Sequence, residues 1–290
     1  MKDENEFYNK FQKLLKNIKK EKPLIHHITN NVTINDCANI TLNWGGLPVM
    51  ASGPEEVEEM VESASALVLN IGTLNNNQLK AMLKAGKIAN KLNIPIVLDP
   101  VGTGATSYRT ESVKSILDKL NISIIKGNKG EIVTLAGESG SIKGVESIGN
   151  YSNIFRPAEK LAEANESIVV VSGEEDIVVT NRKTSIIKKG DPLMGELVGT
   201  GCMLSSTLGV FISTIYNINM LDLNISELDI VQTAVNSYGI IGERAAVKSE
   251  SPARFKIEFM DTIYSLRKEK INLKGISKNS PKSLDRKSER

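Results

Sequence analysis

Short runs of β-branched and apolar residues alternate with longer segments of helical pattern along most of the chain. The runs are almost continuously apolar, as strands buried on both faces must be. They occupy residues 66–72, 94–100, 122–127 and 167–173, and helical segments at 75–93 and 109–120 separate the first three. This alternation predicts βαβ units that form a parallel sheet with helices on both of its faces, an α/β fold.

The second half of the chain follows a different pattern. Two further runs, 176–180 and 184–190, lie close behind the fourth strand and predict an antiparallel hairpin at one edge of the sheet. From residue 199 onward the pattern is helical, with a final helix expected near 252–268. Because the sequence shows no internal repeat and no domain boundary, we predict a single domain over residues 1–270, followed by a basic, disordered tail at 271–290.

Net charge excludes one broad class of partner. The 290 residues carry a formal charge of +2, but residues 267–290 hold nine Lys or Arg against three Asp or Glu, so the rest of the chain is at about −4. A mildly acidic body is not a nucleic-acid surface, and the basic tail lacks interleaved aromatic residues. We therefore expect no nucleic-acid partner.

The sequence also gives an expected location. No segment approaches the roughly 18 consecutive apolar residues of a membrane span, and the charged N-terminus does not resemble a signal peptide. The two cysteines, Cys37 and Cys202, fit a reducing compartment and form no zinc-binding pattern. We expect a cytoplasmic protein without a membrane partner.

Ligands of an open parallel sheet bind beyond the carboxyl ends of its strands. One such end is Asp99, which is followed by Pro100 and a glycine-rich loop. Magnesium is usually held by one or two carboxylates together with substrate phosphates, so Asp99 suits that role. The alternative is a strand-end aspartate that caps a turn.

A second strand end, Lys126, is followed by Asn128-Lys129-Gly130-Glu131. Asn128 and Glu131 have the spacing of a capping box, which stabilises a helix start by about 1 kcal/mol. Glu131 would also lie near bound phosphates and could act through the water shell of a metal ion. The two interpretations do not exclude each other.

The segment Gly199-Thr200-Gly201-Cys202 opens a long helical pattern. Free N–H groups and the helix dipole at such a start favour a bound anion, and a cysteine there is expected to have a lowered pKa and to accept or relay the proton of an attacking alcohol. The alternatives are that the cysteine is a small buried apolar residue and that the glycines only allow close packing.

The N-terminal region contributes polar candidates. His26 and His27 are the only histidines, and as neighbours in an extended segment they point to opposite faces, which argues against joint chelation of one ion. Asn30 to Asn35 either cap a helix or hold a small polar heterocycle. Neither the GxxxxGK[ST] loop nor the GxGxxG pattern is present, which disfavours P-loop and dinucleotide-binding folds.

Six segments in order resemble the hydroxyethylthiazole kinase family over residues 5–268: PLIHHITNNVTINDCANITLNWGGLPVMA, ALVLNIGTL, IVLDPVGTGATSYRTES, IIKGNKGEI, VVVSGEEDIVV and VGTGCMLSS. The resemblance implies a ribokinase-like fold and phosphorylation of the hydroxyl of 4-methyl-5-(2-hydroxyethyl)thiazole by ATP and Mg²⁺, a step of thiamine biosynthesis and salvage. It also implies a homotrimer with active sites at subunit interfaces.

The resemblance further implies individual roles. Met50, Asn30 and Gly199 match substrate-binding positions, Lys126 and Ser172 match ATP-binding positions, and Asp99 and Glu131 match the magnesium-related acidic positions. Catalysis falls to Gly199, Thr200, Gly201 and Cys202. Most ribokinase-like enzymes carry aspartate where this family has cysteine, and a thiol is normally a weaker base than a carboxylate, so we expect Cys202 to assist rather than to be essential.

Two positions depart from the common pattern of the family. Lys126 stands where many members have arginine, so a bidentate phosphate contact becomes a point-charge contact. Ser172 stands where threonine is common and keeps the same hydrogen-bonding capacity.

Other functions remain open at this stage. A kinase of a different small alcohol and an ATP-dependent hydrate dehydratase would share the phosphate machinery, while a non-catalytic thiazole or thiamine-precursor binding protein would keep the pocket alone. Cys202 and the asparagine-rich segment argue against the first two. The joint presence of Asp99, Glu131 and the segment 199–202 argues against the third.

Overall fold

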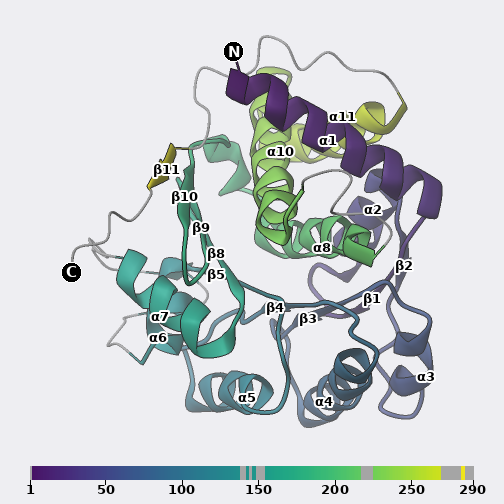
Figure 1. Ribbon diagram of the computed structural model, residues 1–290, viewed down its shortest axis with the longest axis vertical. Helices are drawn as coiled ribbons and strands as arrows, with labels where there is room; N and C mark the ends of the chain where they lie inside the picture. The colour runs from purple at the N-terminus through teal and green to yellow at the C-terminus, as the bar shows by residue number, and fades with distance from the viewer. Residues whose placement is uncertain are drawn as a thin grey trace.

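The computed structural model describes residues 2–137, 142–143, 146–147, 154–216, 225–268 and 282–284. Within them, nine strands form one sheet in the order β11-β10-β9-β8-β5-β4-β3-β1-β2 (Figure 1). These strands are β1 (Leu24–Ile28), β2 (Leu47–Val49), β3 (Ala66–Asn70), β4 (Ile96–Asp99), β5 (Ile124–Asn128), β8 (Ile168–Ser172), β9 (Asp176–Val179), β10 (Thr184–Ile187) and β11 (Lys282–Leu284). Two short strands, β6 (Ile142–Lys143) and β7 (Glu146–Ser147), pair separately.

The strand directions confirm the predicted α/β architecture. The strands from β2 through β1, β3, β4 and β5 to β8 run parallel, and the pairs β8–β9 and β9–β10 are antiparallel. The four predicted strands are β3, β4, β5 and β8, and the predicted hairpin is β9–β10. The sheet is thus mostly parallel with an antiparallel edge.

Three strands of the nine-stranded sheet were not predicted, and neither was the separate pair β6–β7. β1 and β2 add two parallel strands beyond β3, where the sequence indicated only an extended segment and a turn. β11 pairs antiparallel with β10 and comes from the region predicted to be a disordered tail. The other residues of the predicted tail, 271–281 and 285–290, lie outside the described residues, so that expectation stays a prediction for them.

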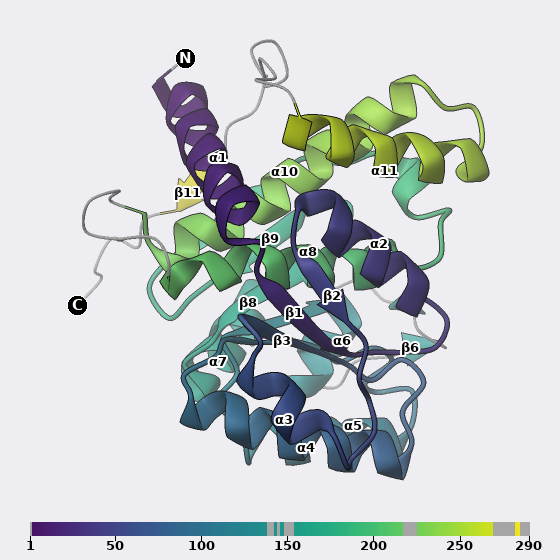
Figure 2. The ribbon, with the colours of Figure 1, turned by 90° about the vertical axis from the view of Figure 1, so that its right-hand side faces the viewer.

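Helices cover both faces of the sheet, in separate layers above and below it in Figure 2. One layer holds α1 (Lys2–Glu21), α2 (Ile34–Trp44), α8 (Thr200–Ile212), α10 (Glu227–Val247) and α11 (Pro252–Lys268). The other holds α3 (Val57–Glu62), α4 (Asn76–Lys91), α5 (Ser107–Leu117), α6 (Lys129–Leu135) and α7 (Phe155–Asn165). The 3₁₀ turns are η1 (Pro192–Met194) and η2 (Ser213–Tyr216).

Successive residues of each central strand point alternately to the two faces of the sheet, so they pack into the two hydrophobic cores in turn. In β3, Ala66 and Val68 belong to the first core, whereas Leu67 and Leu69 belong to the second. All four side chains are buried, which is why the strand reads as continuously apolar.

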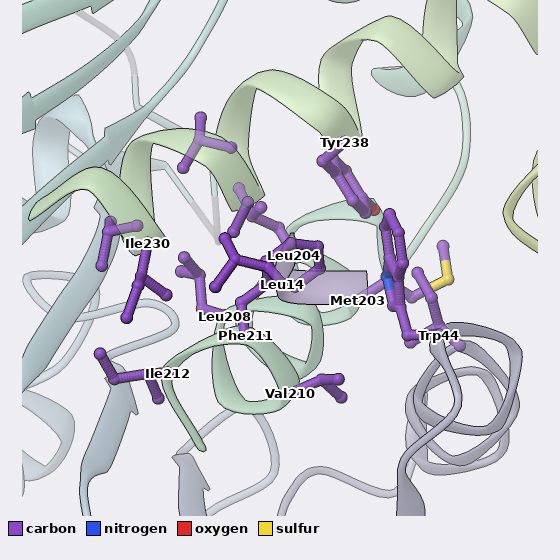
Figure 3. Packing of buried hydrophobic residues seen from close by; sticks show 14 of the residues in the cluster. Leu14, Trp44, Met203, Leu204, Leu208, Val210, Phe211, Ile212, Ile230 and Tyr238 are labelled. Carbon is purple, nitrogen blue, oxygen red and sulfur yellow. The ribbon is translucent and has the colours of Figure 1, made fainter. Parts of the chain in front are cut away.

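The centre of the first core is aromatic. Trp44 packs edge-on against Phe211 with ring centroids 5.0 Å apart, and Phe11 of α1 lies against both rings. Figure 3 shows Trp44 and Phe211 among the aliphatic side chains of α8. At Gly209 a Cβ would lie 2.6 Å from Val68, so the absence of a side chain lets α8 approach β3 closely. This contact fixes α8, and with it the helix start at residue 200, against the sheet.

Within the described residues, no helix combines the length and apolar character needed to cross a membrane.

Candidate active site

The carboxyl ends of the central strands meet the N-terminus of α8. Asn70 ends β3, Asp99 ends β4 and Asn128 ends β5, while Asn30 follows β1 by two residues. Because neighbouring parallel strands end at the same edge of the sheet, these polar side chains gather there. Cys202, in the first turn of α8, joins them.

Asn30, Thr33, Asn70 and Cys202 are linked by hydrogen bonds, and we call them the amide cluster. Asn30 Nδ2 donates to Asn70 Oδ1 over 2.9 Å, and both amide nitrogens donate to Cys202 Sγ, over 3.4 Å from Asn30 and 3.2 Å from Asn70. Asn30 Oδ1 accepts from Thr33 N and Thr33 Oγ1. Since each amide oxygen is fixed by donors, each amide nitrogen has to face the sulfur.

Two glycines make this close packing possible. A Cβ on Gly72 would lie 2.8 Å from Asn30 Cβ, and one on Gly199 would lie 2.7 Å from Thr33 Cγ2. Gly199 also has φ of +99°, a conformation that L side chains rarely adopt. For Gly199 the close-packing interpretation is confirmed, and it does not exclude a role in binding.

Asp99 connects the amide cluster to a buried lysine. Its Oδ2 accepts from Asn70 Nδ2 and Ser205 Oγ, each over 2.8 Å, and its Oδ1 lies 3.2 Å from Lys126 Nζ. Asp99 is fully buried and Lys126 is 4% exposed. Burial alone would lower the pKa of Lys126, but Asp99, Cys202 and Glu131 outweigh it and raise that pKa. Lys126 is therefore charged at neutral pH.

The lysine ammonium faces the start of α8. A Cβ on Gly201 would lie 3.1 Å from Lys126 Nζ, so the ammonium lies close against the first turn of α8. The first N–H groups of a helix lack intrahelical acceptors. The Thr200 hydroxyl donates to Met194 O, and Thr200 O accepts from the Tyr238 hydroxyl. These two groups of Thr200 are therefore already paired, and the helix start offers an anion the backbone N–H groups of Thr200, Gly201 and Cys202, which precede the first helical bond from Met203 N to Gly199 O.

The predicted lowering of the Cys202 pKa is wrong. Burial and the Asp99 carboxylate raise the pKa of the Cys202 thiol, and these two effects exceed the opposing effects of Lys126, Thr33 and Asn70. The sequence indicated the helix start but not the depth of the site. Cys202 is accordingly a neutral thiol at neutral pH.

Glu131, Ser172 and Asp176 lie near the ends of β5 and β8 and at the start of β9, and we call them the carboxylate cluster. Glu131 accepts from Gly102 N and from Asn128 N, each over 2.7 Å, and the second bond completes the predicted capping box. Burial raises the pKa of Glu131 to about 7, against the effect of Lys126. Burial likewise raises the pKa of Asp176 to about 7, although Gly173 N donates to its carboxylate.

The two acidic positions predicted to be magnesium-related can be tested for that role. Among the described residues, no group of three or more His, Cys, Asp or Glu side chains is arranged to hold a metal ion. Magnesium does not need one, since it keeps several waters and binds few carboxylates. Asp99 raises the pKa of Glu131, so the two carboxylates act on each other, and each has further lone pairs beyond its present donors. The residues fit a hydrated magnesium ion.

The remaining predicted residues, Ser172, Met50 and the two histidines, have their own contacts. Ser172 is paired in register with Asn128, and its hydroxyl donates to Gly127 O over 3.3 Å. Met50 follows β2 at the sheet edge beyond β1 and is half-buried. His26 contacts Ala51 O and His27 contacts Thr41 Oγ1, so the two rings have separate partners.

Sequence reasoning missed four residues of this region: Asn70, Ser205, Asp176 and Arg109. Arg109 donates from its guanidinium to Ile71 O, Gly72 O and Val101 O, and thereby joins the loops after β3 and β4. Asn70 was hidden as the last residue of an apolar strand. Its position at the carboxyl end of that strand was the available signal.

Comparison with known proteins identifies a family. The model of the hydroxyethylthiazole kinase family matches residues 15–269. A protein from Thermoanaerobacter sp. (strain X514) named hydroxyethylthiazole kinase is 49% identical over 265 residues, which cover 90% of this chain and 96% of the relative.

Solved structures agree on the fold. The structure of a hydroxyethylthiazole kinase from Pyrococcus horikoshii OT3 is similar with a TM-score of 0.80 and 34% identity, over 96% of this chain and 99% of the other. A ribokinase-like superfamily protein from Enterococcus faecalis V583 is similar with a TM-score of 0.61 and 13% identity, over 84% and 86% of the two chains. The predicted ribokinase-like fold is thereby confirmed.

Proposed function

Because the chain belongs to the hydroxyethylthiazole kinase family, we propose that it transfers the terminal phosphoryl group of ATP to the hydroxyl of 4-methyl-5-(2-hydroxyethyl)thiazole. The single observation that carries the proposal is the position of Lys126, charged and buried between Asp99 and the first turn of α8. A transferring phosphoryl group gathers negative charge, and a lysine beside a helix N-terminus stabilises that charge without reorganisation.

The phosphate end of the site is assigned as follows. The backbone N–H groups of Thr200, Gly201 and Cys202 and the ammonium of Lys126 bind the transferring phosphoryl group. Ser172, at the end of β8, contacts the nucleotide. Asp99 and Glu131 would hold magnesium through its waters, and the ion would supply charge neutralisation between phosphates.

The alcohol end of the site is the amide cluster together with Met50 and Gly199. Asn30 and Met50 bind the thiazole, and Gly199 places the backbone beside the hydroxyethyl group. Phosphoryl transfer proceeds largely through a loose transition state, so positioning contributes more than proton abstraction. Because Cys202 is a neutral thiol, it contacts the reacting hydroxyl and assists its proton transfer, and it does not act as a pre-formed thiolate base.

A homotrimer with active sites at subunit interfaces is part of the same proposal. Val32 and Val198 are 68% and 71% exposed, and they flank the contact between Thr33 and Gly199. Two exposed valines beside the site support its coverage by a neighbouring subunit. Light scattering on the purified protein is expected to give three times the mass of the chain, and a monomeric mass would contradict this part. The cytoplasmic location stays a prediction.

The test of the function is ADP release by the purified protein with ATP and Mg²⁺, measured with and without the thiazole alcohol. We expect thiazole-dependent turnover that weakens in Cys202→Ala by about tenfold to a hundredfold and is kept or raised in Cys202→Asp. Turnover that does not depend on the thiazole, or that is absent, would refute the proposal.

A further inference from the structure

Asn70 lies between the two ends of the site and has hydrogen-bond partners in both. Its Nδ2 donates to Cys202 Sγ over 3.2 Å and to Asp99 Oδ2 over 2.8 Å. Its Oδ1 accepts from Asn30 Nδ2 and from Gly72 N, each over 2.9 Å. The side chain is 1% exposed.

These four contacts use the whole hydrogen-bonding capacity of the carboxamide. A primary amide has two N–H donors and one oxygen with two lone pairs. Each donor of Asn70 faces a group that takes part in the proposed reaction, and each lone pair is filled by a neighbour that holds the amide in place. A buried asparagine needed only for stability has no reason to direct both donors at reacting groups.

The orientation of Asn70 is itself locked. If its amide were turned over, the nitrogen would face Gly72 N and Asn30 Nδ2, both of which are donors. Asn30 cannot turn to compensate, because its own oxygen accepts from Thr33 N and Thr33 Oγ1. Asn70 therefore keeps both N–H groups pointed at Cys202 and Asp99.

We propose that Asn70 is a positioning residue of the phosphoryl transfer. It holds the thiol of Cys202 and the carboxylate of Asp99 in a fixed relative position, and thereby aligns the alcohol end of the site with the phosphate end. This inference rests on the proposed function. With Asn30 and Asn70 both donating to the sulfur, the thiol proton is directed away from the two amides. The amide of Asn70 thus sets both the position of the sulfur and the direction in which its proton is offered.

The first test is Asn70→Asp, which keeps the shape and the Oδ1 acceptor but removes both donors. We expect kcat to fall by about 10- to 100-fold, as for other residues that orient reacting groups, while KM for either substrate changes less than about threefold. The matched control is Asn90→Asp. Asn90 also joins two segments through its carboxamide, with Asn90 Nδ2 donating to Asn121 O and Asn121 N donating to Asn90 Oδ1, but it lies in the last turn of α4, before the amino-terminal end of β4 and away from the site. The control is expected to keep the wild-type kcat.

The second test asks whether Asn70 acts through Cys202. We compare the fold loss of kcat that Asn70→Asp causes in the wild type with the fold loss that it causes in Cys202→Ala. We expect the second loss to be smaller by a factor of at least about three, because the effects of interacting residues are not additive. Equal loss in both backgrounds, wild-type kcat in Asn70→Asp, or the same loss in Asn90→Asp would overturn the proposal.

A third measurement needs no turnover and separates this inference from the proposed function. The rate of alkylation of Cys202 by iodoacetamide is followed by mass spectrometry at fixed pH, with the buried Cys37 as internal reference. Asn70→Asp removes a donor to the sulfur and adds an acidic group, so we expect slower alkylation than in the wild type and in Asn90→Asp. An unchanged alkylation rate in Asn70→Asp would overturn the inference even if the enzyme is active. If alkylation is slower in Asn70→Asp but the wild type shows no thiazole-dependent turnover, only the proposed function is refuted.

Discussion

The amide cluster and the carboxylate cluster both feel the charge of Lys126 and are organised in different ways. In the amide cluster, neutral side chains bond to one another, and the glycines between them leave no spare room. In the carboxylate cluster, Glu131 and Asp176 accept from backbone N–H groups, and burial raises the pKa of each to about 7.

The difference indicates when each side reaches its working state. The amide cluster is satisfied without any ligand, so it can orient an alcohol on arrival. The carboxylate cluster holds one buried carboxyl group, Glu131, and one half-buried carboxyl group, Asp176, whose charge is only partly offset, and a cation would complete it. One side of the site is preorganised by packing, and the other depends on charge brought by the substrate.

The strongest test of this contrast removes Lys126, whose charge acts on residues of both clusters. In Lys126→Gln, Asp99 becomes a buried charge without its cation, and we expect the free energy of unfolding to fall by about 3–5 kcal/mol. We also expect kcat/KM to fall by at least about a thousandfold, measured beside urea denaturation. Lys84→Gln, which breaks the more exposed ion pair with Glu58, is expected to cost less than about 1 kcal/mol. Equal stability of the two variants would show that Asp99 does not depend on Lys126.

Two glycine substitutions compare the packing of the clusters directly. Gly72→Ala places a Cβ 2.8 Å from Asn30 Cβ, and we expect a loss of about 1–3 kcal/mol with a raised KM for the thiazole. In Gly173→Ala the nearest atoms, on Glu175 and Lys129, are 3.6 Å away, and we expect a change within about 0.5 kcal/mol. Thermal unfolding measures both, and similar losses would remove the contrast between a tight and an open cluster.

The charge of the carboxylate cluster gives a dependence on pH. Asp176 has an ordinary pKa of 3.8 and a folded-state pKa of about 7, so between these values the folded protein binds more protons than the unfolded chain. Stability contributed by the neutral acid is therefore lost as pH rises from about 4 through about 7. We expect Asp176→Asn to unfold with the wild-type free energy near pH 4 and to be more stable by about 2 kcal/mol near pH 8, a value reduced for partial exposure. A difference that does not vary with pH would contradict this.

The smallest expected effect concerns the nucleotide contact. Ser172 is half-buried, and Ser172→Thr keeps the hydroxyl and adds one methyl group, so KM for ATP is expected to change less than about threefold. Ser172→Ala loses the hydroxyl and should raise that KM further. A larger effect from threonine than from alanine would show that this cluster is as tightly packed as the other.

The sequence predicted the parts of the fold that repeat a simple pattern. The strands β3, β4, β5 and β8 are continuously apolar because both faces are buried, and the helices between them are amphipathic. The strand β1 was harder to identify because His26 and His27 interrupt its apolar run, yet both are buried. The strand β2 has only three residues, and its side chains are partly exposed.

The sequence could single out site candidates near strand ends and helix starts, but not those that only three-dimensional contact brings together. Asp99 ends β4 and Lys126 lies two residues before the end of β5, so both were visible as candidates, and their roles stay a prediction. The role of Asn70 depends on Asn30, forty residues away in the chain, and on the close approach that Gly72 allows. The pKa of Cys202 was predicted in the wrong direction because burial and Asp99 cannot be read from a local motif.

The placement of α1 against the last helices has a consequence for how the chain is made. Phe11, Leu14 and Ile18 are buried in the core that α8 and α10 complete, and Lys10 pairs with Asp229, 219 residues later in the sequence. At roughly 5–20 residues per second, a ribosome needs about 10–45 s to make that interval. Until then the apolar face of the first helix has only part of its native contacts, first with Trp44 and later with Phe211. The nascent chain is therefore exposed to chaperones and to aggregation until its C-terminal helices emerge, and truncation before α10 would leave the first helix partly uncovered.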